Sequence, residues 1–154
     1  MELRVRLAKQ DDLILTFGFR NDPSTREYSF DQGLIQLEDH MKWFNRELSW
    51  PGKHLMIVEG YDDSKWVPIA LWRVDGADVS MSLAVEWRGQ HLATPVIKTG
   101  IAYVKDKFPT GALAAFIKGD NVRAVKAFAK AGFRYVGRGR VKGHECLVYI
   151  CTTG

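Results

Sequence analysis

The sequence VSMSLAVEWRGQHLAT, residues 79–94, carries most of the fold prediction because it joins a strand to a helix through a short polar loop. Residues 79–85 are typical of a strand, and a helical pattern begins near Leu92. The first N–H groups of a helix have no acceptor within the helix and lie at the positive end of its dipole. The loop therefore predicts a site for an anion such as a diphosphate, with Arg88 and His91 as further donors. An ordinary strand–helix connection has the same pattern.

Hydrophobic spacing and turn residues assign the rest of the chain. Strands are expected at residues 3–7, 54–61, 66–74, 79–85, 112–118, 133–140 and 145–151, and helices at residues 11–19, 37–48, 92–107 and 121–131. A long meander combined with two strand–helix–strand passages predicts a mixed α/β sheet rather than a doubly wound parallel one. No repeat or linker divides the chain, so residues 1–154 are expected to form one domain.

Composition favours a globular protein of the cytoplasm. The chain has 154 residues, of which 46% are hydrophobic and 26% charged, and its net charge is +4. A mild positive charge suits a polyanionic ligand such as a nucleotide. No apolar run approaches the roughly 18 residues that span a bilayer, and no signal peptide is evident, so no membrane partner is expected. The basic residues between Arg134 and Lys142 are interpreted as charges that protect the edge of a β-hairpin from pairing with another chain, rather than as a nucleic-acid contact.

Neither cysteine nor histidine spacing predicts a metal or a disulfide framework. Cys146 and Cys151 are five residues apart in one expected strand, so their side chains should face opposite ways. The four histidines are scattered along the chain, and no pair has the spacing of metal ligands. We therefore expect no metal.

The segment RGQHLA, residues 88–93, resembles the acyl-CoA pyrophosphate loop of the GNAT N-acetyltransferase superfamily, whose pattern is Arg/Gln-x-x-Gly-x-Gly/Ala. The first and last positions match, but His91 stands where glycine is usual. A Cβ at this position restricts the backbone and crowds the phosphates, or else the imidazole itself bonds a phosphate. The resemblance implies the GNAT fold: about seven mostly antiparallel strands, about four helices on both faces, and a splayed central strand pair.

A second segment supports this resemblance. Residues 121–133, NVRAVKAFAKAGF, resemble the family segment Asn-x-x-Ala/Ser-Ile…Tyr/Phe-x-Lys-x-Gly-Phe. The resemblance implies that Asn121, Ala124 and Phe128 line the pantetheine arm of coenzyme A. Many members carry tyrosine at the position of Phe128 as the acid that protonates the thiolate. Phe128 has no hydroxyl, so that role is lost and a core aromatic is the alternative interpretation.

Two N-terminal segments narrow the resemblance to a subgroup. FRNDP, residues 19–23, and LEDHMKWF, residues 37–44, resemble enzymes that acetylate nucleotide-linked amino sugars, as in pseudaminic acid biosynthesis. They also resemble ribosomal-protein N-terminal acetyltransferases. The resemblance runs from about residue 3 to residue 150. It implies an acceptor groove formed by Arg20, Asn21, Tyr28, His40 and Trp43, with Trp72 as a further candidate.

The resemblance also implies how the cofactor and the catalytic groups are placed. In the family, the strand before the loop splays from its neighbour at a bulge and pairs with pantetheine. The expected cofactor contacts from this region are Leu83, Ala84, Val85, Arg88, Gly89, Gln90, His91, Leu92, Ala93 and Thr94. Asp78 is the candidate base, and Ser80 or Ser82 is the alternative, holding a water that relays the proton. Glu86 is interpreted as a surface residue.

The expected activity is transfer of acetyl from acetyl-CoA to a primary amine by direct attack in a ternary complex. The first acceptor considered is a nucleotide-linked amino sugar, and a protein or peptide N-terminus is the alternative within the enzyme class. A GNAT module that binds acyl-CoA without turnover is the second class of function. A monomer or homodimer with a small-molecule acceptor, and without a nucleic-acid partner, is expected.

Overall fold

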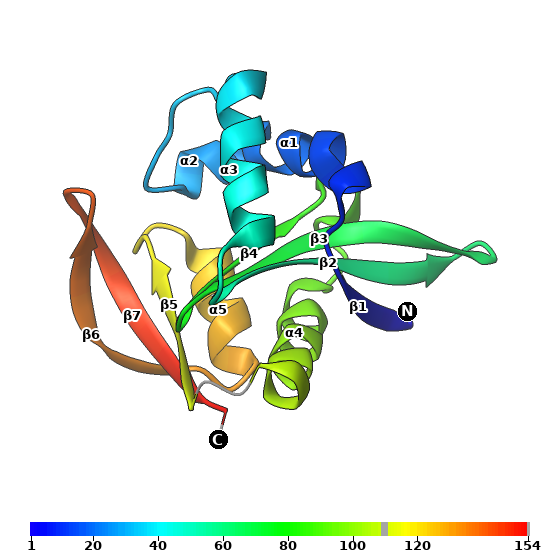
Figure 1. The fold of residues 1–154 in the computed structure, drawn as a ribbon. Coiled ribbons are helices and arrows are strands. Elements are labelled where there is room, and N and C mark those ends of the chain that lie inside the picture. The colour runs from blue at the N-terminus through cyan, green and yellow to red at the C-terminus, as the bar shows by residue number, and fades with distance from the viewer. Residues whose placement is uncertain (109–110, 154) are drawn as a thin grey trace.

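The computed structural model describes residues 1–108 and 111–153 and contains one seven-stranded sheet with five α-helices among them (Figure 1). The strands are β1 (Leu3–Leu7), β2 (Lys53–Asp62), β3 (Lys65–Asp75), β4 (Asp78–Leu83), β5 (Ala112–Ile117), β6 (Arg134–Val141) and β7 (His144–Thr152). The helices are α1 (Leu13–Asn21), α2 (Pro23–Tyr28), α3 (Leu37–Ser49), α4 (Ala93–Lys107) and α5 (Val122–Lys130), with short 3₁₀ turns at Gln10–Asp12 and Val85–Trp87. All seven expected strands are present.

The sheet has the order β1-β2-β3-β4-β5-β7-β6, and only the β4–β5 pair is parallel. That parallel pairing covers two positions, Asp78 with Ala114 and Val79 with Ala115. Beyond them the two strands separate, while β4 stays paired with β3 to Leu83 and β5 stays paired with β7 to Ile117. The splayed central pair is therefore confirmed, and each diverging strand is held by its outer neighbour.

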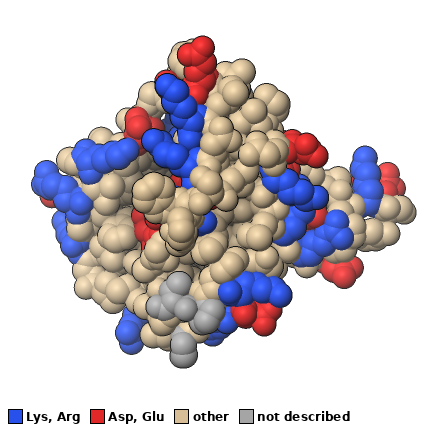
Figure 2. Space-filling view, viewed as in Figure 1, with Lys and Arg blue, Asp and Glu red and all other residues tan. Residues whose placement is uncertain are grey.

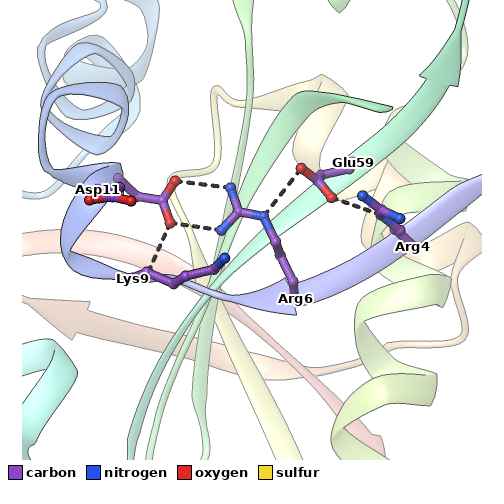
Figure 3. Close-up of a pocket in the computed structure, with 6 residues that line it drawn as sticks. Arg4, Arg6, Lys9, Asp11 and Glu59 are labelled. Carbon is purple, nitrogen blue, oxygen red and sulfur yellow. Dashed lines mark hydrogen bonds and ion pairs between the residues drawn. The ribbon is translucent and has the colours of Figure 1, made fainter. Parts of the chain in front are cut away.

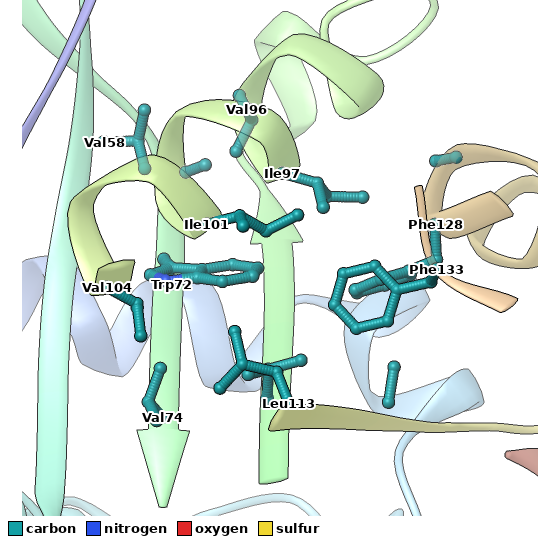
Figure 4. Close-up of a cluster of buried hydrophobic side chains, with 14 of the residues drawn as sticks. Val58, Trp72, Val74, Val96, Ile97, Ile101, Val104, Leu113, Phe128 and Phe133 are labelled. Atoms are coloured by element: carbon teal, nitrogen blue, oxygen red, sulfur yellow. The ribbon is translucent and has the colours of Figure 1, made fainter. Parts of the chain in front are cut away.

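Helices cover both faces of the sheet and bury two separate cores. Helices α1, α2 and α3 lie on one face, and α4 and α5 lie on the other (Figure 1). The larger core, between the sheet and α4 and α5, surrounds Trp72, Ile97 and Leu113 (Figure 4). The smaller core, beneath α1 and α3, is built on Phe44 and Ile57 with their neighbours. Because successive side chains of β2 point to opposite faces of the sheet, this strand contributes side chains to both cores.

Two expectations differ from the structure. The strand expected at residues 79–85 ends at Leu83, because Val85–Trp87 forms a 3₁₀ turn. The family's bulge is absent from the described pairing of β4 with β3, which has no register shift. Helix α2 was not expected because it has only six residues. Asp22 caps it by accepting a hydrogen bond from the Thr25 N–H at 3.1 Å, and Pro23 occupies its first turn.

A network of charged side chains joins β1 to β2 at one edge of the sheet (Figure 3). Arg6 bonds Asp12 through both Nη atoms, at 2.7 and 2.9 Å, and Glu59 accepts from both Arg4 and Arg6. The hydrogen bond from Arg6 holds the pKa of Asp12 below its ordinary value, against the opposing effect of burial. These residues, with Lys9 and Asp11, line a cavity of about 370 Å³. The arginines and carboxylates named here satisfy one another, which makes the network part of the fold.

The close packing of α4 on the sheet predicts the effect of adding one methyl group. An ideal Cβ on Gly100 lies 2.6 Å from Cε2 of Trp72, which is fully buried. Gly100→Ala should lower the free energy of unfolding by about 1–3 kcal/mol, because overpacking outweighs the helix propensity of alanine. Urea denaturation measures the change.

Gly18→Ala is the matched control, because Gly18 also lies in a helix and has nothing within 4 Å of its Cβ position. We expect this variant to be unchanged or more stable by up to about 1 kcal/mol. Equal losses in the two variants would contradict the packing explanation.

Candidate active site

The gap between β4 and β5 exposes backbone groups that no strand uses. The Ala84 N–H donates to the Ile69 carbonyl of β3 at 2.8 Å. The alternation of an antiparallel ladder then turns the N–H groups of Met81 and Leu83 away from β3, toward the gap. Both residues lie beyond Val79, the last residue of β4 that pairs with β5. A chain that enters this gap finds strand-like donors on its β4 side.

Some of the expected backbone contacts are already taken. The Leu83 carbonyl accepts from Arg88 Nη2 at 2.9 Å and from Arg88 Nε at 3.2 Å. Ala84 uses its N–H on β3 and its carbonyl on the Trp87 N–H at 3.0 Å. Val85 is exposed, and its carbonyl accepts from the Arg88 N–H at 3.3 Å. The expected Leu83 N–H therefore faces the gap, joined by the Met81 N–H, whereas both backbone groups of Ala84 are used within the fold.

The loop before α4 presents a row of unused N–H groups. No acceptor among the described residues bonds the backbone N–H groups of Gly89, Gln90, His91, Leu92, Ala93 and Thr94. No side chain caps α4, whose positive dipole end therefore faces the loop. Gly89 and His91 have φ angles of 74° and 59°, which fold the chain back on itself. This geometry is that of an anion-binding helix N-terminus.

Two polar side chains of the loop face away from this row. Gln90 Nε2 donates to the Glu86 carbonyl at 3.1 Å. Arg88 Nη2 donates to Asp22 Oδ2 at 2.7 Å and ties the loop to the start of α2. Partial burial opposes ionisation of Asp22, but the hydrogen bonds from Arg88 and Thr25 prevail and hold its pKa below the ordinary value. Arg88 acts in this structure as a link between the cofactor loop and α2.

The expected pantetheine contacts on α5 divide into two kinds. Asn121 caps α5 by accepting from the Ala124 N–H at 3.4 Å, so both residues lie at the open end of the helix. Phe128 is 4% exposed and packs edge-on against Phe133 at 5.0 Å between ring centroids. Figure 4 shows both rings inside the larger core. Phe128 is therefore placed as a core aromatic.

The candidate catalytic residues share the sheet face that α1 and α3 cover. Asp78 and Ser80 lie opposite Asp75 and Arg73 across the β3–β4 ladder, and cross-strand partners share a face. Asp78 is exposed as a residue, but desolvation of its carboxyl raises its pKa; nearby Asp75 adds to this, and Arg73 opposes it. A carboxylate with a raised pKa is a stronger base, as amine deprotonation requires. Both residues stand beside the point where the gap opens.

The expected acceptor residues are brought together, but only some can touch a ligand. The Arg20 guanidinium lies 3.8 Å from the ring centre of Trp43, and Arg20 Nη1 donates to His40 Nδ1 at 3.0 Å. His40 has no exposed surface. It therefore positions Arg20 rather than contacting an acceptor directly.

Asn21 and Trp72 also have structural places, whereas Tyr28, the last residue of α2, is half-buried. Asn21 bonds both backbone groups of Ile35 at 2.8 Å and so anchors the loop between α2 and α3. Trp72 is fully buried under α4, on the opposite face of the sheet, and cannot line the acceptor groove. Sequence reasoning missed Asp22 and Thr25, for which the Asp-Pro pair was the available helix-start signal.

Comparisons with known proteins assign the family. The family described as Acetyltransferase (GNAT) domain matches residues 2–134, so the chain belongs to the GNAT acetyltransferases and is an N-acetyltransferase. No curated protein matches the chain. No described helix is long and apolar enough to cross a membrane. Within the described residues, no group of three or more His, Cys, Asp or Glu could hold a metal ion.

Solved structures share the fold at low sequence identity. Spermidine N-acetyltransferase from Vibrio cholerae, in complex with CoA and spermine, has a TM-score of 0.84 and 16% identity, over 98% of this chain and 95% of that one. Aminoglycoside acetyltransferase AAC(6')-Ib with coenzyme A has a TM-score of 0.82 and 15% identity, with the same coverage. A domain from Methanocaldococcus jannaschii has a TM-score of 0.83 and 18% identity, over 98% of each chain.

The positive φ of His91 predicts an unusual response to glycine. A left-handed backbone costs an L-residue about 1–2 kcal/mol, which glycine does not incur. His91→Gly should therefore leave the free energy of unfolding unchanged or raise it by about 1 kcal/mol, although glycine in place of another residue normally destabilises. Urea denaturation of the ligand-free protein measures the change.

Gln90→Gly is the control, because Gln90 is the exposed neighbour of His91 and does not have a positive φ. This variant should lose stability. A loss in His91→Gly as large as that in Gln90→Gly would show that the strain at His91 is negligible.

Proposed function

We propose that the protein transfers acetyl from acetyl-CoA to a primary amine of a small acceptor, by direct attack in a ternary complex. The observation that carries the proposal is the end of the β4–β5 pairing at Val79, in the strand that leads to the loop of unused N–H groups at residues 89–94. A thioester with a long amide-bearing arm and a diphosphate fits this combination. The amides of the arm can pair with the free N–H groups of β4, and the diphosphate can bind the N–H groups of the loop. Membership of the GNAT acetyltransferases supports the same conclusion.

Acetyl-CoA would lie with its diphosphate on the N–H groups of residues 89–94 and its pantetheine arm between β4 and β5. The arm's amides would pair with β4 as a short added strand, using the Met81 and Leu83 N–H groups. The thioester would then reach the closed end of the gap, where the strands meet at Val79. Ala124 and Asn121 would border the other side of the arm.

The reaction requires a base for the amine and donors for the oxyanion. The neutral amine nitrogen attacks the thioester carbonyl, its excess proton passes to Asp78 directly or through a water on Ser80, and a backbone N–H of β4 bonds the oxyanion. Collapse of the intermediate breaks the C–S bond and releases the CoA thiolate. Phe128 has no proton to donate, so the thiolate takes its proton from water.

The expected acceptor remains a nucleotide-linked amino sugar, on the strength of the N-terminal resemblance and of Arg20 and Trp43. Trp43 offers an aromatic ring to a sugar face, and Arg20 offers a guanidinium to a phosphate. A peptide N-terminus and acyl-CoA binding without turnover are the alternatives. Two of the solved structures that share the fold contain amines, spermine in one and kanamycin in the other, which supports an amine acceptor in general.

A thiol-release assay tests the proposal. Acetyl-CoA is mixed with the protein and a panel of sugar nucleotides, peptides and polyamines, and free CoA is measured with a thiol reagent. We expect release that depends on at least one amine of the panel. Binding of acetyl-CoA without release across the panel would favour the non-catalytic alternative.

Asp78→Asn is the informative variant in the same assay. Without the carboxylate, turnover should fall by about 10²–10⁴-fold at low pH, and the loss should shrink as rising pH deprotonates the amine without help. Asp106→Asn is the matched control, because it removes an equal charge from an exposed residue at the far end of α4, and we expect only a small change. An Asp78→Asn profile parallel to wild type at every pH would remove Asp78 as the base.

A further inference from the structure

Arg20, near the end of α1, lines a small cavity beside the proposed acceptor site. The cavity has a volume of about 100 Å³, and Thr25, Ser29, Asp31 and Ile35 form the rest of its wall. A phosphate or carboxylate group fits there, whereas a nucleoside does not.

The charge of Arg20 lacks the compensation that three other arginines have. Arg6, Arg73 and Arg88 each lie 2.7 Å from a carboxylate oxygen, on Asp12, Glu47 and Asp22 respectively. No carboxylate among residues 1–108 and 111–153 lies within 4.0 Å of Arg20. Burial lowers the pKa of Arg20 to about 10, and the charge of Arg73 adds to the effect. The carboxylates of Glu47 and Asp31 oppose it without reaching salt-bridge distance, and the group stays cationic at neutral pH.

The surroundings of Arg20 fix its direction and leave donors unused. Burial, the largest effect, and the charge of Arg20 lower the pKa of His40, against the opposing effect of the hydrogen bond to the Leu13 carbonyl, so the imidazole is neutral and adds no negative charge. His40 Nε2 donates to the Leu13 carbonyl at 2.8 Å, which leaves Nδ1 to accept from Arg20 Nη1. With one donor held and one guanidinium face stacked on Trp43, the other N–H groups have no acceptor in the described structure.

The other polar groups of the cavity suit an oxyanion. The Ser29 hydroxyl accepts from the Asp31 N–H at 3.2 Å, so its own proton is free to be donated. The Asp31 carboxylate lies 3.6 Å from Lys142 Nζ, which offsets its charge. A guanidinium and a hydroxyl proton thus converge on a space of the right size.

The cavity adjoins the reaction site. Thr25, in its wall, lies 3.5 Å from Arg88 Nη2, and Arg88 holds the Leu83 carbonyl at the end of β4. The Trp43 ring that stacks on Arg20 also lies 5.9 Å from Arg73, whose partner across the ladder is Ser80. A small acceptor can therefore place an anionic group on Arg20 while its amine approaches β4.

We propose that this cavity is an oxyanion subsite: the acceptor carries a phosphate or carboxylate group that binds Arg20 and Ser29, so the enzyme selects anionic amines over polycationic ones. The proposal rests on the acetyl-transfer function argued above. Polycationic amines are disfavoured because the guanidinium repels them, whereas an anionic group supplies the missing partner. This choice differs from the amines named for the solved structures that share the fold.

Matched pairs of amines test the selection. Glucosamine is compared with glucosamine 6-phosphate for the phosphate arm, cadaverine with lysine for the carboxylate arm, and spermidine represents polycations. We expect kcat/KM to be at least about tenfold higher for the anionic member of at least one pair, and Arg20→Gln to abolish that ratio mainly through KM. Which pair responds distinguishes phosphate from carboxylate.

Because the kcat/KM ratio compares the two members of a pair on the same variant, a general loss of folded protein affects both members equally and cancels. Arg20→Lys keeps the charge and should retain part of the preference, and Lys105→Gln removes an equal charge at the far end of α4 and should retain all of it. A wild-type preference for spermidine, or an equal effect of Arg20→Gln on both members of each pair, would overturn the subsite.

A binding measurement separates this proposal from the acetyl-transfer function. The melting temperature is recorded with glucosamine 6-phosphate and with lysine in the presence of CoA, for wild type and Arg20→Gln. Binding that depends on Arg20 without any transfer would retain the subsite and refute acetyl transfer. Transfer to amines without any Arg20-dependent binding or preference would refute the subsite alone, and neither transfer nor binding would refute both.

Discussion

The site depends on the brevity of the β4–β5 pairing, which ends after two positions. Unpaired backbone groups inside a sheet are costly unless water or a ligand satisfies them, so strands normally stay paired along their length. Here the separation persists because β3 holds β4 to Leu83 and β7 holds β5 to Ile117. The sheet stays continuous around Asp78 and opens beyond it. Free backbone N–H groups of β4 are thus available to the arm of a ligand, although β4 lies inside the sheet and not at its edge.

The loop before α4 also presents unpaired backbone N–H groups to a ligand, here at the start of a helix rather than along a strand. Its N–H groups are unused because no side chain caps α4, and the left-handed backbone at Gly89 and His91 shapes the turn. Arg88, which the motif suggests as a phosphate donor, instead bonds Asp22 and the Leu83 carbonyl. The loop, the end of β4 and the start of α2 are therefore joined by one side chain. Arg88 therefore connects the proposed cofactor site to the helix that borders the proposed acceptor site.

Hydrophobic spacing and turn chemistry were sufficient to predict the seven strands and four of the helices, and the motif at residues 88–93 located the loop. Helix α2 was not predicted because a segment of six residues is too short to show a helical pattern of hydrophobic residues. Side-chain partners far apart in sequence were beyond prediction: Arg88 and Asp22 are 66 residues apart, and no local pattern records that contact. For the same reason His40 was expected at the acceptor, since only the packing of α1 against α3 shows that it is buried behind Arg20. Trp72 was misjudged because its sheet face depends on the register of β3.

The central claim is that acetyl-CoA binds through backbone N–H groups of the loop and of β4. Amide chemical shifts of ¹⁵N-labelled protein, recorded during titration with CoA and with pantetheine, test it most directly. CoA should shift the amides of residues 89–94 together with Met81 and Leu83, whereas pantetheine, which lacks the diphosphate, should shift only the two strand amides. Shifts confined to the charged cavity at the β1–β2 edge, or identical responses to both ligands, would contradict the account.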